Sequence, residues 1–376
     1  MTPLRLEHPS APILPGLAAA LDGTAWQGAQ FAPLPDTGLA HHHVALVGSQ
    51  PPALARIPKQ SQLRLDAVDN LRYQAACFAR AAPSGHTPHL FAELRPSGGL
   101  TRGALIVEHV SGRAAVLAGA PDALDGADAM DGATDASNAA LDDLAAIVRA
   151  LASIHSLPVP IGRDPIMGPA DPLAELAAEI EAQSLFLDSA SLQPGVRALI
   201  ERELIRLAAL VSQPERPSVR LISFDAHPGN FVVRNDGEAV LVDLEKCRYS
   251  YPSLDLAHAT LYTSTTWEQG ATTSLSPARV RGAHDLWAMQ MSQVGAGQAD
   301  ASEWHVPLRR AMWLWSVTWC AKWRVLSGAA PSTSGDGEDW AAANSADQLA
   351  QHVRGRVDHY LSATIVERVT SEFDQL

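Results

Sequence analysis

The stretch Leu221-Ile-Ser-Phe-Asp-Ala-His-Pro-Gly-Asn-Phe-Val-Val-Arg-Asn-Asp-Gly-Glu-Ala-Val-Leu-Val-Asp-Leu-Glu245 decides the fold of this chain. It is typical of a buried strand, a polar loop, a short hairpin and a second polar end. Three polar side chains, Asp225, Asn230 and Asp243, stand where the apolar runs end. Residues at such positions are held by a rigid scaffold and presented to solvent or a ligand, so this stretch predicts a functional site.

The pattern also predicts how these side chains meet. Phe231 to Arg234 and Ala239 to Val242 are apolar runs separated by Asn235-Asp-Gly237, a combination that favours a β-hairpin. A hairpin brings Asn230 and Asp243 to the same end, where an amide and a carboxylate oxygen suit a hard cation. Asp225 then supplies a carboxylate to orient and deprotonate a hydroxyl, so the set fits phosphoryl transfer. The simpler alternative is that Asp225 and Asn230 only shape turns.

The length and composition of the chain set limits on its architecture. A chain of 376 residues is long for one hydrophobic core and natural for two lobes. Hydrophobic residues make up 47% of the sequence without an apolar run near 18 residues, which is typical of a soluble globular protein. The N-terminus lacks the charged and apolar regions of a secretory signal, so we expect the protein in the cytoplasm.

Cysteine usage and net charge exclude several classes of function. Cys77, Cys247 and Cys320 are widely spaced, which disfavours a disulfide framework or a zinc site and predicts buried thiols. The formal charge of −13 disfavours nucleic acid as a partner, because phosphate contacts dominate that affinity. An acidic surface suits a cationic substrate, although ordinary solubility explains it equally well.

The first part of the chain predicts a small antiparallel sheet with one helix. Strands are expected within residues 33–48 and 53–57, an amphipathic helix over 66–82 and a buried strand within 103–112. Gly38 lies in the turn of the first hairpin, where its backbone either approaches phosphates or forms a plain turn. His41, His42 and His43 point alternately to opposite faces of a strand, which disfavours a shared metal ion. We therefore expect an N-terminal lobe at residues 1–110 and a C-terminal lobe at 111–376.

The second part predicts helices around the central stretch. Residues 119–137 lack periodicity and favour a loop, whereas 139–155, 172–187 and 194–211 have helical spacing, and the chain after about residue 276 is helical throughout. Five of the nine tryptophans lie between Trp304 and Trp323 at helical spacings. Most of these rings are expected in the core, with one or two lining a substrate pocket.

On these motifs the chain resembles the aminoglycoside phosphotransferase and choline kinase-like family, from about residue 30 to 265. The resemblance implies an α+β fold, the bilobal protein kinase-like fold, with a small antiparallel-sheet N-lobe and a large, mainly helical C-lobe. Asp225-Ala-His-Pro-Gly-Asn230 is similar to the catalytic loop, which implies Asp225 as the base, Asn230 as a Mg²⁺ ligand and His227 as a supporting residue. Val242-Asp-Leu-Glu245 resembles the metal-binding segment, which implies Asp243 as the main Mg²⁺ ligand with Glu245 nearby.

Three further segments carry the resemblance. Pro252-Ser-Leu-Asp-Leu-Ala257 implies that Asp255 is a buried acid bracing the catalytic loop. Leu105-Ile-Val-Glu-His-Val-Ser-Gly112 looks like the nucleotide-binding hinge, with adenine held near Glu108, His109 and Val110. Ala150-Leu-Ala-Ser-Ile-His-Ser-Leu-Pro158 is similar to the helix end that precedes the acceptor region.

The chain also departs from the family pattern. Ser223 stands where the loop usually opens with histidine, and Gln74 stands where a glutamate is expected to pair with the phosphate-binding base. That base is Arg56, which would clamp phosphate oxygens in bidentate fashion, or Lys59, which would act as a point charge. The flap around Gly38 has no Gly-x-Gly-x-x-Gly spacing, which agrees with this family and not with protein kinases proper.

Two functions are compatible with these residues. The first is an ATP- and Mg²⁺-dependent kinase that phosphorylates a hydroxyl of a small molecule resembling an aminoglycoside, an amino alcohol or a sugar. The second is a catalytically weak or inactive kinase-like protein that binds a nucleotide or another ligand, supported by Ser223 and Gln74. Acceptor contacts are expected in the helical tail, where composition alone suggests Trp267, Glu268, Asp285 and Trp315.

Overall fold

A computed structural model of the chain describes residues 13–119, 142–268, 273–294, 302–332 and 336–376. The expected loop at 120–137 lies outside the described residues. The chain forms two compact units. The first comprises Met1–Arg80, Pro88–Val110 and Leu326–Val353, and the second comprises Ala81–Thr87, Ser111–Val325 and Arg354–Leu376.

The first unit is built on a five-stranded antiparallel sheet with the strand order β1-β2-β3-β5-β4. Leu17 of the first helix packs against inward-facing Val44, Ala55 and Ile106 in one hydrophobic core. Gly16 and Gly99 approach so closely that a side chain at either position would collide with the other backbone. The elements are α1 (Leu14–Ala20), β1 (Gln30–Pro33), β2 (His41–Val47), β3 (Ala53–Pro58), α2 (Ala67–Ala81), β4 (Leu90–Leu94) and β5 (Ala104–Glu108).

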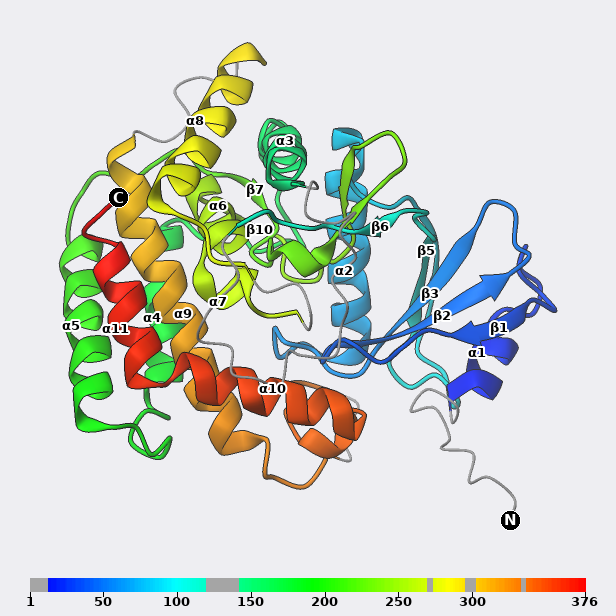
Figure 1. The fold of residues 1–376 in the computed structure, drawn as a ribbon. Coiled ribbons are helices and arrows are strands. Elements are labelled where there is room, and N and C mark those ends of the chain that lie inside the picture. Colours follow the sequence, from blue (N-terminus) through cyan, green and yellow to red (C-terminus); the bar gives the residue numbers. More distant parts are fainter. Residues whose placement is uncertain (1–12, 120–141, 269–272, 295–301, 333–335) are drawn as a thin grey trace. The chain divides into compact units, whose positions relative to one another are not determined.

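The second unit contains two small antiparallel sheets and most of the helices of the chain, which are labelled in Figure 1. One sheet has the strand order β6-β8-β9 and the other pairs β7 with β10. Helices α3, α6 and α8 pack against one another. The strands are β6 (Arg113–Ala114), β7 (Arg220–Ile222), β8 (Phe231–Val233), β9 (Ala239–Leu241) and β10 (Arg248–Ser250). The helices are α3 (Leu144–His155), α4 (Pro172–Ser184), α5 (Pro194–Val211), α6 (Pro252–Thr260), α7 (Tyr262–Thr265), α8 (Pro277–Gln293), α9 (His305–Leu326), α10 (Asp347–Tyr360, which begins in the first unit) and α11 (Ala363–Glu372).

Local sequence explains where several helices begin. Asp171 accepts hydrogen bonds from the backbone N–H groups of Leu173 and Ala174, and Pro172 follows it, so α4 begins there. The helix expected from residue 139 begins instead at Leu144. The carboxylate of Asp143 accepts hydrogen bonds from Arg113 and from the backbone N–H of Val116, which ties this residue to the preceding segment.

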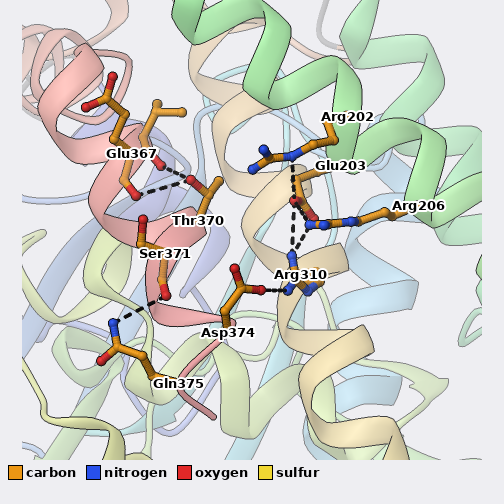
Figure 2. Close-up of polar contacts among 10 residues, drawn as sticks. Arg202, Glu203, Arg206, Arg310, Glu367, Thr370, Ser371, Asp374 and Gln375 are labelled. Carbon is orange, nitrogen blue, oxygen red and sulfur yellow. Dashed lines mark hydrogen bonds and ion pairs between the residues drawn. The ribbon is translucent and has the colours of Figure 1, made fainter.

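A buried glutamate joins three helical segments of the second unit. Figure 2 shows Glu203 of α5 between Arg202, Arg206 and Arg310, and Arg310 also reaches Asp374 after α11. Both carboxylate oxygens of Glu203 lie 3.0 Å from Nη1 of Arg310 on α9. A fully buried carboxylate needs such partners to offset its lost hydration, so this cluster anchors α5, α9 and the C-terminal segment together.

The described thiols and tryptophans follow the sequence-based expectation. Cys77, Cys247 and Cys320 are buried, and none of these three thiols forms a disulfide bond. Trp304, which directly precedes α9, and the tryptophans of α9 are buried or half-buried. Among the described residues, no helix is both long and apolar enough to cross a membrane.

Candidate active site

The loop after β7 is held by a single buried carboxylate. Asp255 of α6 accepts hydrogen bonds from the backbone N–H groups of Ser223 and Phe224, both at 2.7 Å. Phe224 has a φ of 59°, a conformation that bulky residues rarely adopt without outside support. Ser223 then accepts a hydrogen bond from the N–H of Asp225 through its Oγ at 3.1 Å. Asp255 and Ser223 together fix the backbone that carries Asp225.

Asp225 lies beside two basic side chains. Its Oδ2 is 2.9 Å from Nζ of Lys246, and its Oδ1 is 3.8 Å from Nδ1 of His258. Burial opposes ionisation of Asp225, but the basic groups around it, Lys246 foremost, together outweigh burial, and the pKa of Asp225 falls below its ordinary value. Burial lowers the pKa of His258 to about 4, so this imidazole is neutral at pH 7. The site therefore holds an ionised carboxylate next to a neutral histidine.

An aromatic and ionic layer packs around this pair. The ring of Trp315 lies 5.3 Å from Nζ of Lys246 and meets the ring of Phe224 edge to face at 5.2 Å. The guanidinium of Arg248 also packs over the ring of Phe224, 3.7 Å from the ring centroid. Glu179 accepts hydrogen bonds from Trp315 Nε1 at 2.7 Å and Arg248 at 3.0 Å. Burial raises the pKa of Glu179, but the contacts with Arg248 and then Trp315 together outweigh burial, so this pKa is lowered. The negative charge of Glu179 then balances the positive charge of Arg248 in this layer.

The hairpin places the candidate metal ligands at one end. The carbonyl of Asn230 accepts a hydrogen bond from the N–H of Val242 at 2.9 Å, next to Asp243. The side-chain amide of Asn230 donates to the carbonyl of Asp225 at 2.8 Å, which fixes the orientation of its own Oδ1. The N–H of Glu245 donates to Asp243 at 3.4 Å, so both carboxylates lie on one short turn. An oriented amide oxygen and two carboxylates are the donors that Mg²⁺ prefers, and these residues fit that ion.

In the first unit, His41 lies between Arg56, a candidate for phosphate binding, and Gln74, the residue expected to support it. Nε2 of His41 is 3.0 Å from Oε1 of Gln74, and Nδ1 is 3.4 Å from Nη2 of Arg56. The guanidinium of Arg56 also lies 5.6 Å from the ring centroid of Phe78. Arginine is always a donor, so Nδ1 accepts and Nε2–H donates to Gln74. The neutral Gln74 matches a neutral histidine here, where a glutamate was expected to meet arginine directly.

Lys59 is engaged by the flap. Its ammonium donates to the carboxylate of Asp36 at 2.6 Å and to the carbonyl of Gly38 at 2.9 Å. Burial lowers the pKa of Lys59, and the contact with Asp36 only partly offsets this effect. Lys59 thus fixes the segment that contains Gly38.

The hinge segment follows directly from β5. Glu108 is the last residue of that strand, and His109 and Val110 continue without regular structure. The N–H of Glu108 donates to the carbonyl of His89, and that of His109 donates to Pro52. Both amides therefore donate to carbonyl groups of the residues that immediately precede β4 and β3.

The four acceptor candidates fall in different surroundings. Trp315 belongs to the layer around Asp225, and the carboxylate of Glu268 lies against Gly229 of the loop, where a side chain at position 229 would collide with it. Trp267 packs its ring against Trp319 and Tyr360. Asp285 is exposed on α8, and its electrostatic influence falls on His305. The described contacts join Trp315 and Glu268, but not Asp285, to the loop.

Several residues of this site were not expected from the sequence. Lys246 directly follows the Asp-x-Glu segment, and His258 follows Asp255 by three residues on one helix, so their spacing was a usable signal. Glu179 and Arg248 carry no such signal, because they come from separate elements that only the fold brings together.

His227, which the sequence suggested as a supporting residue, lies beside the site, with its ring 6.0 Å from that of His258.

Comparison with known proteins identifies relatives of this fold. Residues 46–290 match the sequence model described as the phosphotransferase enzyme family. A putative aminoglycoside phosphotransferase from Ralstonia eutropha has a similar structure, with a TM-score of 0.55 and 14% identity over 94% of this chain and 98% of that one. A choline kinase from Cryptosporidium parvum gives 0.53 and 11% over 92% and 90%.

A macrolide 2'-phosphotransferase from Brachybacterium faecium gives a TM-score of 0.52 and 10% identity over 92% of this chain and 98% of that one. No curated protein sequence matches the chain. The expected α+β, protein kinase-like fold and the family resemblance are both confirmed.

Proposed function

The chain belongs to the phosphotransferase enzyme family, and we propose that it transfers the γ-phosphoryl group of ATP, with Mg²⁺, to a hydroxyl of a small molecule. The observation that carries the proposal is the loop 223–230. Its backbone is fixed by Asp255, it presents the ionised Asp225, and it ends at the oriented amide of Asn230.

Asp225 is the proposed base. The acceptor hydroxyl donates a hydrogen bond to the Asp225 carboxylate, which takes its proton as the hydroxyl oxygen bonds to the γ-phosphorus. The bond from that phosphorus to the β–γ bridging oxygen breaks, and ADP leaves. The lowered pKa of Asp225 keeps the carboxylate ionised and able to orient the hydroxyl at neutral pH.

Asn230 and Asp243 are the proposed Mg²⁺ ligands, with Glu245 close to them. When bound, Mg²⁺ neutralises phosphate charge and thereby favours transfer. The role of the chain is to orient the donors: Asp225 fixes the Asn230 amide, and the β8–β9 hairpin fixes the position of Asp243.

The first unit is the proposed nucleotide-binding lobe. We assign phosphate binding to Arg56 in preference to Lys59, because Lys59 already donates to Asp36 and Gly38. His41 and Gln74 then orient Arg56. For adenine we favour the N–H of Val110, since the N–H groups of Glu108 and His109 already donate to the carbonyls of His89 and Pro52.

The acceptor is proposed to bind beside the loop in the second unit. Trp315 and Glu268 are the candidates that the loop contacts support, whereas Trp267 shapes the aromatic cluster behind them. Aminoglycoside-like, amino alcohol and sugar hydroxyls are the classes to be examined.

A second candidate function is a weak or inactive kinase-like binding protein. One observation favours it: Asp225 forms an ion pair with Lys246, and a carboxylate with a lowered pKa is a weaker base.

Two measurements separate these functions. In a thermal shift experiment, a kinase is stabilised most when ATP and Mg²⁺ are both present, whereas a binding protein shows no shift or one indifferent to Mg²⁺. Release of ADP is then measured against a panel of hydroxyl-bearing amines, sugars and amino acids. Acceptor-dependent ADP release supports the kinase; Mg²⁺-indifferent binding of ATP without any ADP release contradicts it.

A further inference from the structure

Behind the loop, three helices contribute a fully buried chain of hydrogen bonds. Nε1 of Trp287 on α8 donates to Nδ1 of His155 at the end of α3, with a separation of 3.0 Å. Nε2 of His155 lies 3.1 Å from Oδ2 of Asp255 on α6. His155, Asp255 and Trp287 are each 0% exposed. Water therefore does not compete for these hydrogen bonds.

The indole determines which ring nitrogen of His155 carries the proton. An indole N–H only donates, so Nδ1 of His155 must present its lone pair. In the neutral ring the proton then lies on Nε2, which donates to the carboxylate of Asp255. The opposite tautomer would direct Nδ1–H at the indole N–H and a lone pair at a carboxylate oxygen, which is unfavourable at both ends.

The carboxylate of Asp255 connects His155 to the backbone of the loop. Its two oxygens accept hydrogen bonds from the backbone N–H groups of Ser223 and Phe224, which immediately precede Asp225. With the third hydrogen bond from His155, both oxygens have defined partners and the carboxylate cannot rotate without losing one. The unusual φ of Phe224 depends on this support.

We propose that Trp287 is a positioning residue: it fixes the Nε2–H tautomer of His155 and, through Asp255, the backbone that presents Asp225. Trp287 does not touch the reacting groups in this scheme. Its kinetic consequence rests on the proposed phosphotransferase function, whereas its structural consequence does not.

Trp313 offers a matched control. It lies on α9, is also 0% exposed, and its Nε1 has no hydrogen-bond partner among the described residues. Trp287→Phe and Trp313→Phe thus remove the same atoms from buried sites, but only the first removes an indole hydrogen bond. Differences between the variants report that bond and not the loss of volume.

The first test uses the tautomer and the loop amides. In ¹⁵N-labelled full-length protein, we expect the imidazole nitrogens of His155 to show the pure Nε2–H tautomer in the wild type and in Trp313→Phe, and a mixture in Trp287→Phe. Hydrogen exchange at the amides of Ser223 and Phe224 should accelerate by about tenfold in Trp287→Phe alone, since one bond to a charged group is weakened. An unchanged tautomer, or equal exchange in both variants, overturns the proposal.

The second test is kinetic and uses slow ADP release from MgATP with water as the acceptor. Trp287→Phe should lower kcat by about tenfold more than Trp313→Phe and leave the KM for ATP unchanged, because the base is misplaced and the nucleotide site is not. Equal losses in the two variants count against positioning. Absence of ADP release from the wild type, both with water and with every acceptor of the panel, contradicts the kinase function and leaves the tautomer and exchange results to decide the role of Trp287.

If Trp287→Phe does not fold, His155 provides the comparison. Glutamine at position 155 has a carbonyl that can accept from Trp287 and an amide that can donate to Asp255, whereas leucine has neither. We expect the loop amides to be protected at least about tenfold better in His155→Gln than in His155→Leu. Equal protection would show that the chain of hydrogen bonds does not hold the loop.

Discussion

The ammonium of Lys246 lies 2.9 Å from Oδ2 of Asp225, and the two side chains are only 10% and 12% exposed. Burial lowers the pKa of Lys246, but Asp225 and then Glu245 outweigh it, so the pKa is raised and the lysine is charged. The candidate base is therefore presented as one half of a buried ion pair. An acceptor hydroxyl must compete with, or bind beside, this ammonium.

Removal of the Lys246 ammonium should destabilise the folded protein, because the buried carboxylate of Asp225 loses its charged partner. We expect Lys246→Met to lower the free energy of unfolding by about 3–5 kcal/mol at pH 7, because Asp225 is left as an uncompensated charge. In the double variant Lys246→Met/Asp225→Asn, most of this loss should be recovered. Urea unfolding of the wild type, the two single variants and the double variant measures the coupling. Strictly additive losses would show that the pair contributes nothing.

The same substitution has a kinetic consequence with a defined sign. Without the ammonium, burial dominates at Asp225 and its pKa rises, so the base is protonated over a wider range at low pH. The acid limb of kcat against pH for ADP release should therefore move to higher pH in Lys246→Met. Lys59→Met, which breaks the Lys59–Asp36 pair in the first unit, should leave that limb where it is. An acid limb that does not move in Lys246→Met would assign it to another group.

Asn230 and Asp243 should fail in different ways. Asn230→Asp retains an oxygen ligand but cannot donate to the carbonyl of Asp225, so we expect a lower kcat by about tenfold or more with Mg²⁺ affinity retained. Asp243→Asn keeps the loop but loses a ligand charge, so half-saturation with Mg²⁺ should rise by at least about tenfold. Titration of ADP release with MgCl₂ gives both quantities. The reverse pattern would exchange the two assigned roles.

Ser223 should act through the backbone of the loop. In Ser223→Ala the buried N–H of Asp225 loses its acceptor, and we expect a loss of about 1–3 kcal/mol in unfolding free energy together with reduced kcat. Ser316→Ala is the control, because its buried hydroxyl donates only to the carbonyl of Met312 within α9. Thermal unfolding and ADP release of the two variants check the difference. Equal, small effects would show that Ser223 does not support the base.

The central loop and hairpin could be predicted because their signals are local. Apolar runs of strand length, an Asn-Asp-Gly turn and polar residues at their ends specify β8, β9 and the side chains between them. The helix expected at 139–155 was placed too early, because the carboxylate of Asp143 bonds to Arg113 and Val116, which are distant in sequence. Periodicity carries no information on such tertiary contacts.

The surroundings of Asp225 could be predicted only in part for the same reason. Glu179, Arg248 and Trp315 come from α4, β10 and α9, and no spacing in the sequence relates them. Trp315 was suggested as an acceptor contact from composition alone, and in the structure its ring lies beside Lys246. Asp285 was selected on the same grounds, but its environment is α8 and His305. Composition suggests residue types for a pocket and does not select among them.

His258 predicts a specific loss of stability in acid. Its pKa is about 4 in the folded protein and about 6.5 when unfolded, so below pH 6.5 only the unfolded chain takes up the proton. Stability from this residue is complete above pH 6.5 and falls by about 1.4 kcal/mol per pH unit down to pH 4. Between pH 7.5 and 5 we expect the wild type to lose about 2 kcal/mol more than His258→Gln in urea unfolding. His89→Gln, at an exposed site, should lose as much as the wild type; a parallel decline in wild type and His258→Gln would mean that His258 is protonated in the folded state.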